Sequence, residues 1–154
     1  MGKPFYTLEE TTRDVQTVLD EGFYLIPGFL KLTMEQVQQE SNGTGPGSWS
    51  SSRRRFLTGI EPEGARLATI AHDIGYCCPD KSRAIFDQLN QDLYDNQRRH
   101  ADLHHSDDPV KHAYCLAWAE AEYQAVHLGG WGAWIAGDCL QELAPLDEGP
   151  EVLG

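Results

Sequence analysis

Long apolar runs are absent from this sequence. No stretch of its 154 residues approaches the roughly 18 consecutive apolar residues that a membrane-spanning helix needs. The opening MGKPFYTLEE lacks the apolar segment of a secretory signal peptide, and Tyr6 does not fit the pattern for N-terminal myristoylation. We therefore expect a soluble, cytoplasmic protein with no transmembrane segment.

Positive charge is scarce. The chain has 12 Lys and Arg residues against 24 Asp and Glu residues, which gives a formal net charge of -12 and a pI near 4.7. Surfaces that bind nucleic acid need concentrated Lys and Arg, so we expect no direct contact with nucleic acid. A cation or a basic patch on another protein is a more compatible ligand.

Several motifs of catalysis and metal binding are also missing. The sequence contains no Cys-x-x-Cys pair and no Gly-x-Ser-x-Gly elbow, and NGTGPG is not followed by the Gly-Lys-Ser/Thr of a phosphate-binding loop. Two of the four cysteines are adjacent, which is unlike a disulfide framework. We expect all four to be free, buried thiols: Cys77, Cys78, Cys115 and Cys139.

The composition is sufficient for one core: 40% of the residues are hydrophobic, and the length suits a single domain over residues 1–154. Thr7 with Glu10 forms a capping-box pattern that predicts a helix over about 8–20, and a second such box at Thr33 predicts another short helix. Between them, Pro27-Gly28 should end an extended segment in a turn.

Beyond a Gly/Ser-rich loop over 41–62, apolar residues recur at helical spacing almost to the end of the chain. The resulting fold class is mainly α, with two central antiparallel helices crossed by a third. We predict these helices over about 63–78, 81–101 and 110–129, with a polar connection at HADLHHSDDP and a flexible acidic tail over 141–154.

The stretch ATIAHDIGYCC raises the main functional question. At about 100° per residue, Leu67, Ile70 and Ile74 share one face of the predicted helix, and His72 and Tyr76 share the opposite face. In an ordinary helix such residues hydrogen-bond to neighbours or face water. HDIGY resembles the HD phosphohydrolase motif, but that family needs an upstream histidine and His72 is the first in the chain. Four further histidines could bind a transition metal, but they lie in a polar loop region without fixed helical spacing, and we expect them to be solvated: His100, His104, His105 and His112.

The order of three motifs resembles the phospholipase A2-like superfamily. In those enzymes a glycine-rich calcium loop precedes a helix with His-Asp-x-x-Tyr, and a second antiparallel helix supplies an aspartate. The corresponding stretches here are NGTGPGSW, HDIGY and FDQLNQDL. The same order, with the late AVHLGGWGAW, also resembles short phage-encoded proteins of unassigned function.

The resemblance implies roles for particular residues. His72 would be a general base supported by Tyr76, and its second nitrogen would bond to Asp87 or, in another register, to Asp92. Asp73 would bind Ca²⁺. Backbone carbonyls from the glycine-rich loop would complete the calcium site: Gly43, Thr44 and Gly45.

Two functions follow. The first is a phage-derived acidic protein on a phospholipase A2-like scaffold, which binds a basic surface of a host or virion protein in the cytoplasm of the host cell, with the His-Asp pair structural. The alternative is a Ca²⁺-dependent ester hydrolase that acts on phospholipid, and in that case Ca²⁺ is the cofactor.

Overall fold

The computed structural model describes residues 5–41 and 60–144, and within these ranges every regular element is a helix. The mainly α, single-domain fold class is confirmed. None of the described helices is long and apolar enough to cross a membrane. In chain order the elements are α1 (Leu8–Asp20), η1 (Phe29–Lys31), α2 (Met34–Glu40), α4 (Glu63–Gly75), α5 (Arg83–His104), α6 (Pro109–Gly129), α7 (Trp131–Ala136) and η2 (Gln141–Leu143).

The first two helices begin at their predicted caps. Thr7 Oγ1 accepts a hydrogen bond from Glu10 N at 3.1 Å, and the Glu10 carboxylate accepts one from Thr7 N at 2.9 Å. Thr33 and Gln36 repeat this reciprocal arrangement at α2. Each box pairs backbone N–H groups that the first helical turn leaves without partners, and so both helices start where local sequence directs.

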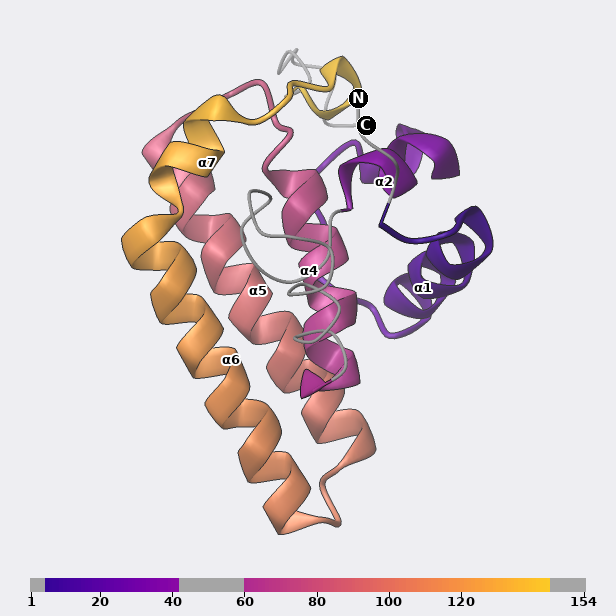
Figure 1. The fold of residues 1–154 in the computed structure, drawn as a ribbon, viewed down its shortest axis with the longest axis vertical. Coiled ribbons are helices and arrows are strands. Elements are labelled where there is room, and N and C mark those ends of the chain that lie inside the picture. Colours follow the sequence, from indigo (N-terminus) through magenta and orange to yellow (C-terminus); the bar gives the residue numbers. More distant parts are fainter. Residues whose placement is uncertain (1–4, 42–59, 145–154) are drawn as a thin grey trace, which may run out of the picture.

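Helix α4 is the centre of the molecule. Figure 1 shows α1 and α2 on one side of it and the long α5–α6 hairpin on the other, with α7 and η2 over one end. Ile70 and Ile74 pack into a core with Val15 and Phe29 from the N-terminal part. Since α4 is covered on both sides, His72 on its polar face is buried as well, whereas Asp73 and Tyr76 are half-buried.

The long helices differ from their predicted limits in two places. α4 ends at Gly75 rather than near 78, and α5 continues to His104 through a segment predicted to be a polar connection. The third long helix, expected to cross the central pair, runs back alongside α5 (Figure 1). Asp108 caps its first turn by accepting a hydrogen bond from Lys111 N at 3.1 Å.

The predicted turn at Gly28 is present, and tertiary contacts explain its residue type. Gly28 has φ +94°, and a side chain there would meet the backbone oxygen of Glu142 in η2. η2 itself was expected to belong to the flexible tail. Instead Leu143 is only 1% exposed, and the tail residues from 145 onward lie outside the described part of the chain.

The four cysteines are free, as expected, but they are not all buried. Cys77, Cys78 and Cys115 are buried, whereas Cys139 is exposed. Burial raises the pKa of the Cys77 thiol, and the nearby Glu40 carboxylate raises it further. A thiol held in its neutral form is a poor nucleophile, so we assign the buried cysteines to packing.

Candidate functional site around His72

His72 is buried against α5 in the last turn of α4. Its Nε2 lies 2.8 Å from Oδ1 of Asn90 on α5. An amide oxygen only accepts hydrogen bonds, so Nε2 carries the proton and Nδ1 holds the lone pair of the ring. Asn90 is fully buried, and within the described part of the chain its Nδ2 has no hydrogen-bond partner.

This environment keeps His72 neutral. Burial lowers its pKa to about 4, because the charged imidazolium loses its hydration, and the hydrogen bond to Asn90 offsets only part of that effect. A carboxylate in place of the Asn90 amide would favour the charged ring. With an amide there, His72 is a weak base at neutral pH.

Tyr76 joins the same cluster one turn later. Its hydroxyl donates to Asn90 Oδ1 at 3.0 Å, and its ring lies 4.3 Å from the His72 ring, measured between centroids. On its other side the Tyr76 ring makes an edge contact with Trp134 of α7 at 5.4 Å. Burial raises the Tyr76 pKa, so its hydroxyl stays protonated and serves as a donor.

Gly130, between α6 and α7, makes room for this tyrosine. A Cβ built on Gly130 would lie 2.8 Å from the Tyr76 hydroxyl oxygen and 2.5 Å from the carbonyl oxygen of Val126. The GGWGAW stretch is therefore tied to the His72 cluster by close packing. We name His72, Tyr76 and Asn90 the histidine–asparagine cluster.

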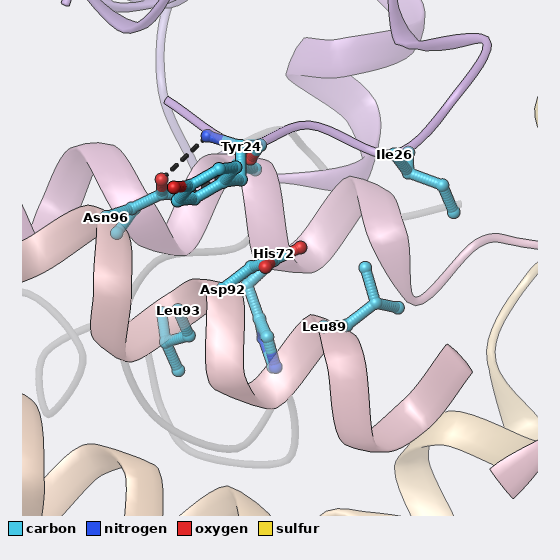
Figure 2. A pocket seen from close by; sticks show the side chains of 9 residues that line it. Tyr24, Ile26, His72, Leu89, Asp92, Leu93 and Asn96 are labelled. Carbon is cyan, nitrogen blue, oxygen red and sulfur yellow. Dashed lines mark hydrogen bonds between the residues drawn. The ribbon is translucent and has the colours of Figure 1, made fainter. Parts of the chain in front are cut away.

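Space beside His72 is limited. A cavity of about 10 Å³ lies between α4, α5 and the segment after α1 (Figure 2), roughly the volume that one water molecule needs. Asn96 holds that segment over the cavity with two hydrogen bonds. Its side-chain amide accepts one from Tyr24 N at 2.7 Å and donates one to Tyr24 O at 3.0 Å. The cavity lining consists of Tyr24, Ile26, Ala68, Ala71, His72, Leu89, Asp92, Leu93 and Asn96.

The expected hydrogen bond from His72 to an α5 carboxylate is replaced by the bond to Asn90. Asp87 instead accepts from Arg83 Nε at 3.1 Å, with half of its side chain exposed. Asp92 lines the cavity, and it accepts from Gln88 at 2.8 Å. The reason is the register of α5. Its inward stripe contains Phe86, Asn90, Leu93 and Gln97, and both aspartates lie off that stripe.

Of the predicted calcium ligands, the described part of the chain includes only Asp73. Asp73 directly follows His72 on α4, and its backbone oxygen accepts from the Cys77 thiol at 3.6 Å. Gly43, Thr44 and Gly45 lie outside the described residues. Calcium binding at Asp73 therefore stays a prediction.

A second polar group, half-buried between helices, was missed by sequence reasoning. The Glu122 carboxylate on α6 accepts from Trp118 Nε1 at 2.8 Å, from Thr69 of α4 at 3.3 Å and from Gln97 of α5 at 3.4 Å. Burial raises its pKa. The contacts join three helices through one carboxyl group, which indicates a structural crosslink.

Comparisons with known proteins found no match among protein-family models, curated protein sequences or solved structures. The resemblance to phospholipase A2-like proteins thus rests on HDIGY and the order of the motifs around it. Asn90 and Asn96, which organise the cluster and its cavity, carried no recognisable sequence signal, because an Asn inside a polar helix is unremarkable until the facing helix is known.

Proposed function

We propose that this chain acts by binding another protein through the outer face of α6, and that its His-Asp pair is structural. The observation that carries the proposal is an apolar stripe on α6 that faces away from the core. Apolar area left exposed along a whole helix is typical of an interaction surface.

The helical wheel locates this stripe. α6 packs inward through few residues, with Cys115 and Ala119 buried. The opposite side carries apolar residues at spacings of three and four, all of them exposed. We name it the α6 stripe; its members are Val110, Tyr114, Ala117, Ala121, Ala125 and Leu128.

The ends of the α6 stripe are its most exposed parts. Val110 is 81% exposed and Leu128 is 80% exposed, and Trp131 and Ile135 on the following α7 are exposed as well. The small alanines in between would let a partner helix approach closely. The stripe therefore suits a helical or flat apolar partner surface.

Charge indicates the kind of partner. With a net charge of -12, the chain attracts a basic protein and repels a second copy of itself. We infer a partner whose apolar centre is surrounded by Lys and Arg. A basic surface of a host or virion protein is the proposed partner, since the net charge favours a basic surface and the resemblance to short phage proteins favours that source.

The histidine–asparagine cluster supports the same proposal. A general base works best with a pKa near the working pH and with a substrate in reach, whereas His72 has a pKa of about 4 beside a cavity of about 10 Å³. These properties suit a buried polar crosslink between α4 and α5. The competing function is the Ca²⁺-dependent ester hydrolase.

The experiment uses a synthetic amphipathic helix of about 20 Leu and Lys residues as a defined basic partner. Backbone amide shifts of the isotope-labelled chain are followed by NMR during titration at low and high salt. We expect the shifts to cluster on the α6 stripe and to weaken with salt, because charge attraction is screened. Ala121→Arg should weaken binding at least about tenfold, or about 1.4 kcal/mol. The matched control is Ala84→Arg, at an exposed position of α5, which should bind as wild type does.

Three outcomes would contradict the proposal. One is an absence of shifts on α6 at millimolar peptide. Another is a dimer in sedimentation equilibrium that Ala121→Arg dissociates, which would assign the stripe to a second copy of the chain. The third is Ca²⁺-dependent release of fatty acid from phospholipid vesicles by wild type that His72→Ala abolishes without a change in melting temperature.

A further inference from the structure

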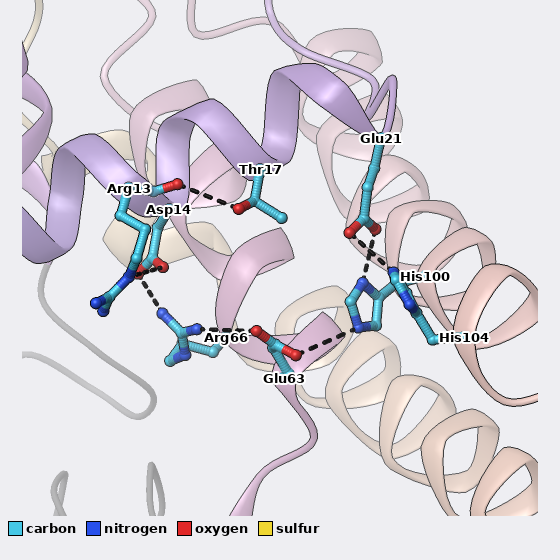
Figure 3. Close-up of polar contacts among 8 residues, drawn as sticks. All are labelled: Arg13, Asp14, Thr17, Glu21, Glu63, Arg66, His100 and His104. Carbon is cyan, nitrogen blue, oxygen red and sulfur yellow. Dashed lines mark hydrogen bonds and ion pairs between the residues drawn. The ribbon is translucent and has the colours of Figure 1, made fainter.

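Three ligand-type side chains meet at the opposite end of α4 from His72. Glu21, at the C-terminal cap of α1, faces two neighbouring histidines in the last turns of α5 (Figure 3). One carboxylate oxygen is 2.7 Å from His100 Nδ1, and the other is 3.0 Å from His104 Nε2. We name Glu21, His100 and His104 the His/Glu cluster.

The extension of α5 creates the histidine pair. Residues 100 and 104 are one helical turn apart, so both rings project from the same face of α5, and their centroids are 4.3 Å apart. Such i, i+4 spacing is a frequent arrangement for two imidazole ligands of one metal ion. In the sequence analysis these residues belonged to a polar connection, so the two histidines had no defined spacing.

The backbone holds the carboxylate in place. Gly22 has φ +68° and ends α1, and Arg99 Nε donates to the backbone oxygen of Glu21 at 2.6 Å. These contacts fix the position of the Glu21 backbone, from which its side chain projects. The carboxylate is thus positioned by local structure as well as by the histidines.

The His100 ring is fixed independently. A Cβ on Gly64 would lie 2.8 Å from the Cβ and Cδ2 atoms of His100, so the ring packs directly on the first turn of α4. Its other nitrogen, Nε2, faces Glu63 at 3.9 Å, and Glu63 pairs in turn with Arg66. Histidine ligands commonly direct their second ring nitrogen to a carboxylate, which orients the ring and raises its basicity.

We propose that the His/Glu cluster binds one divalent transition-metal ion of the zinc class, through His100 Nδ1, His104 Nε2 and the Glu21 carboxylate. The three ligand atoms lie within 4.8 Å of one another, which small side-chain rotations bring to the roughly 2.0–2.2 Å bond lengths of zinc. Two nitrogen donors disfavour Ca²⁺, which takes oxygen ligands.

This site lies apart from the α6 stripe and does not depend on the proposed function. His104 is half exposed, so an ion has access from solvent, whereas His100 is buried. Three protein ligands leave a fourth zinc position for water. Bound metal would join the end of α1 to the end of α5 and stabilise the fold by linkage.

The test uses the untagged full chain after treatment with EDTA. Zn²⁺ is titrated by isothermal calorimetry, Co²⁺ is added to observe its visible absorption, and melting temperature is measured with Zn²⁺ or Ca²⁺. We expect one Zn²⁺ per chain, a Co²⁺ spectrum of low coordination number, and a melting temperature that rises with Zn²⁺ and not with Ca²⁺. Binding should weaken at acidic pH, because the ligands must be deprotonated.

Variants then assign the site. His104→Ala should weaken Zn²⁺ binding by more than about a hundredfold, since loss of even an outer hydrogen-bond partner of a ligand costs about 10- to 100-fold. Glu21→Gln should weaken it too, while Glu63→Gln should do so by about tenfold. His112→Ala is the matched control, because His112 also pairs with a carboxylate, that of Asp102 at 2.8 Å.

Cys139→Ser controls for zinc capture by the exposed thiol and should bind as wild type does. The proposal is overturned if His104→Ala binds Zn²⁺ as tightly as wild type, or if Cys139→Ser abolishes binding. It is equally overturned if Zn²⁺ changes neither heat nor melting temperature, which would leave the cluster as an ion pair between two helices.

Discussion

The buried His72 should make stability depend on pH in a specific window. In the unfolded chain a histidine binds its proton near pH 6.5, whereas in the folded chain His72 does so only near pH 4. Between these values the unfolded state holds one proton more than the folded state. The free energy of unfolding is therefore full above about pH 6.5 and falls as the pH drops toward about 4.

The size of this loss follows from the two pKa values. Each pKa unit corresponds to about 1.4 kcal/mol, so the difference between about 6.5 and about 4 amounts to about 3 kcal/mol. Other groups also contribute to the pH dependence, among them Glu122, whose pKa is raised by burial. A wild-type curve alone therefore does not isolate His72.

His72→Gln isolates it, because glutamine does not titrate and its amide N–H can still donate to Asn90. Urea unfolding of both proteins, followed by circular dichroism from about pH 7.5 to 4, gives the free energy of unfolding at each pH. We expect the advantage of wild type over the variant to shrink by about 3 kcal/mol across this range, at similar urea slopes. Parallel curves, with a constant difference between the two proteins, would refute the assignment of His72 as a buried neutral base.

Three further predictions test the packing around the cluster and the N-terminal turn. Asn90→Asp should raise the His72 pKa above about 4, because it places a negative charge at the position now 2.8 Å from Nε2, and an NMR titration of the ring protons that shows no change would contradict this. Gly130→Ala should lower the free energy of unfolding by about 1–3 kcal/mol, because the added Cβ crowds Tyr76. The control is Gly132→Ala, where a Cβ meets no atom within 4 Å, and thermal melts should show it to be neutral or slightly stabilising. Gly28→Ala should lower the melting temperature clearly, since φ +94° strains an alanine and its Cβ would meet η2; a melting temperature equal to wild type would argue against this contact.

The histidine–asparagine cluster shows how much a sequence motif alone can predict. HDIGY correctly placed His72 and Tyr76 on one face of a helix that packs against a second helix. The partner on that second helix was expected among the aspartates, because carboxylates are the usual partners of catalytic histidines. The register of α5 decided otherwise, and it presents Asn90, an amide that leaves the ring neutral.

Local signals in the sequence determined the elements of this protein. These signals act over a few residues: the capping boxes at Thr7 and Thr33, the glycine turn at Gly28 and the apolar spacing beyond 62. The helices form largely where these signals predict them. The net charge was also readable directly. Each of these depends on residues that are neighbours in the chain, so no knowledge of the fold was needed.

Only the tertiary structure decided which side chains meet. Packing against α1 and α4 accompanies the continuation of α5 to His104, which brings two histidines to Glu21, a residue about 80 positions away in the chain. Packing of α6 on α5 leaves the apolar side of α6 exposed, and only a small cavity remains beside His72. Contacts of this kind depend on the rotation of one helix about its axis relative to another, and a change of one residue in that register alters which side chain faces the site.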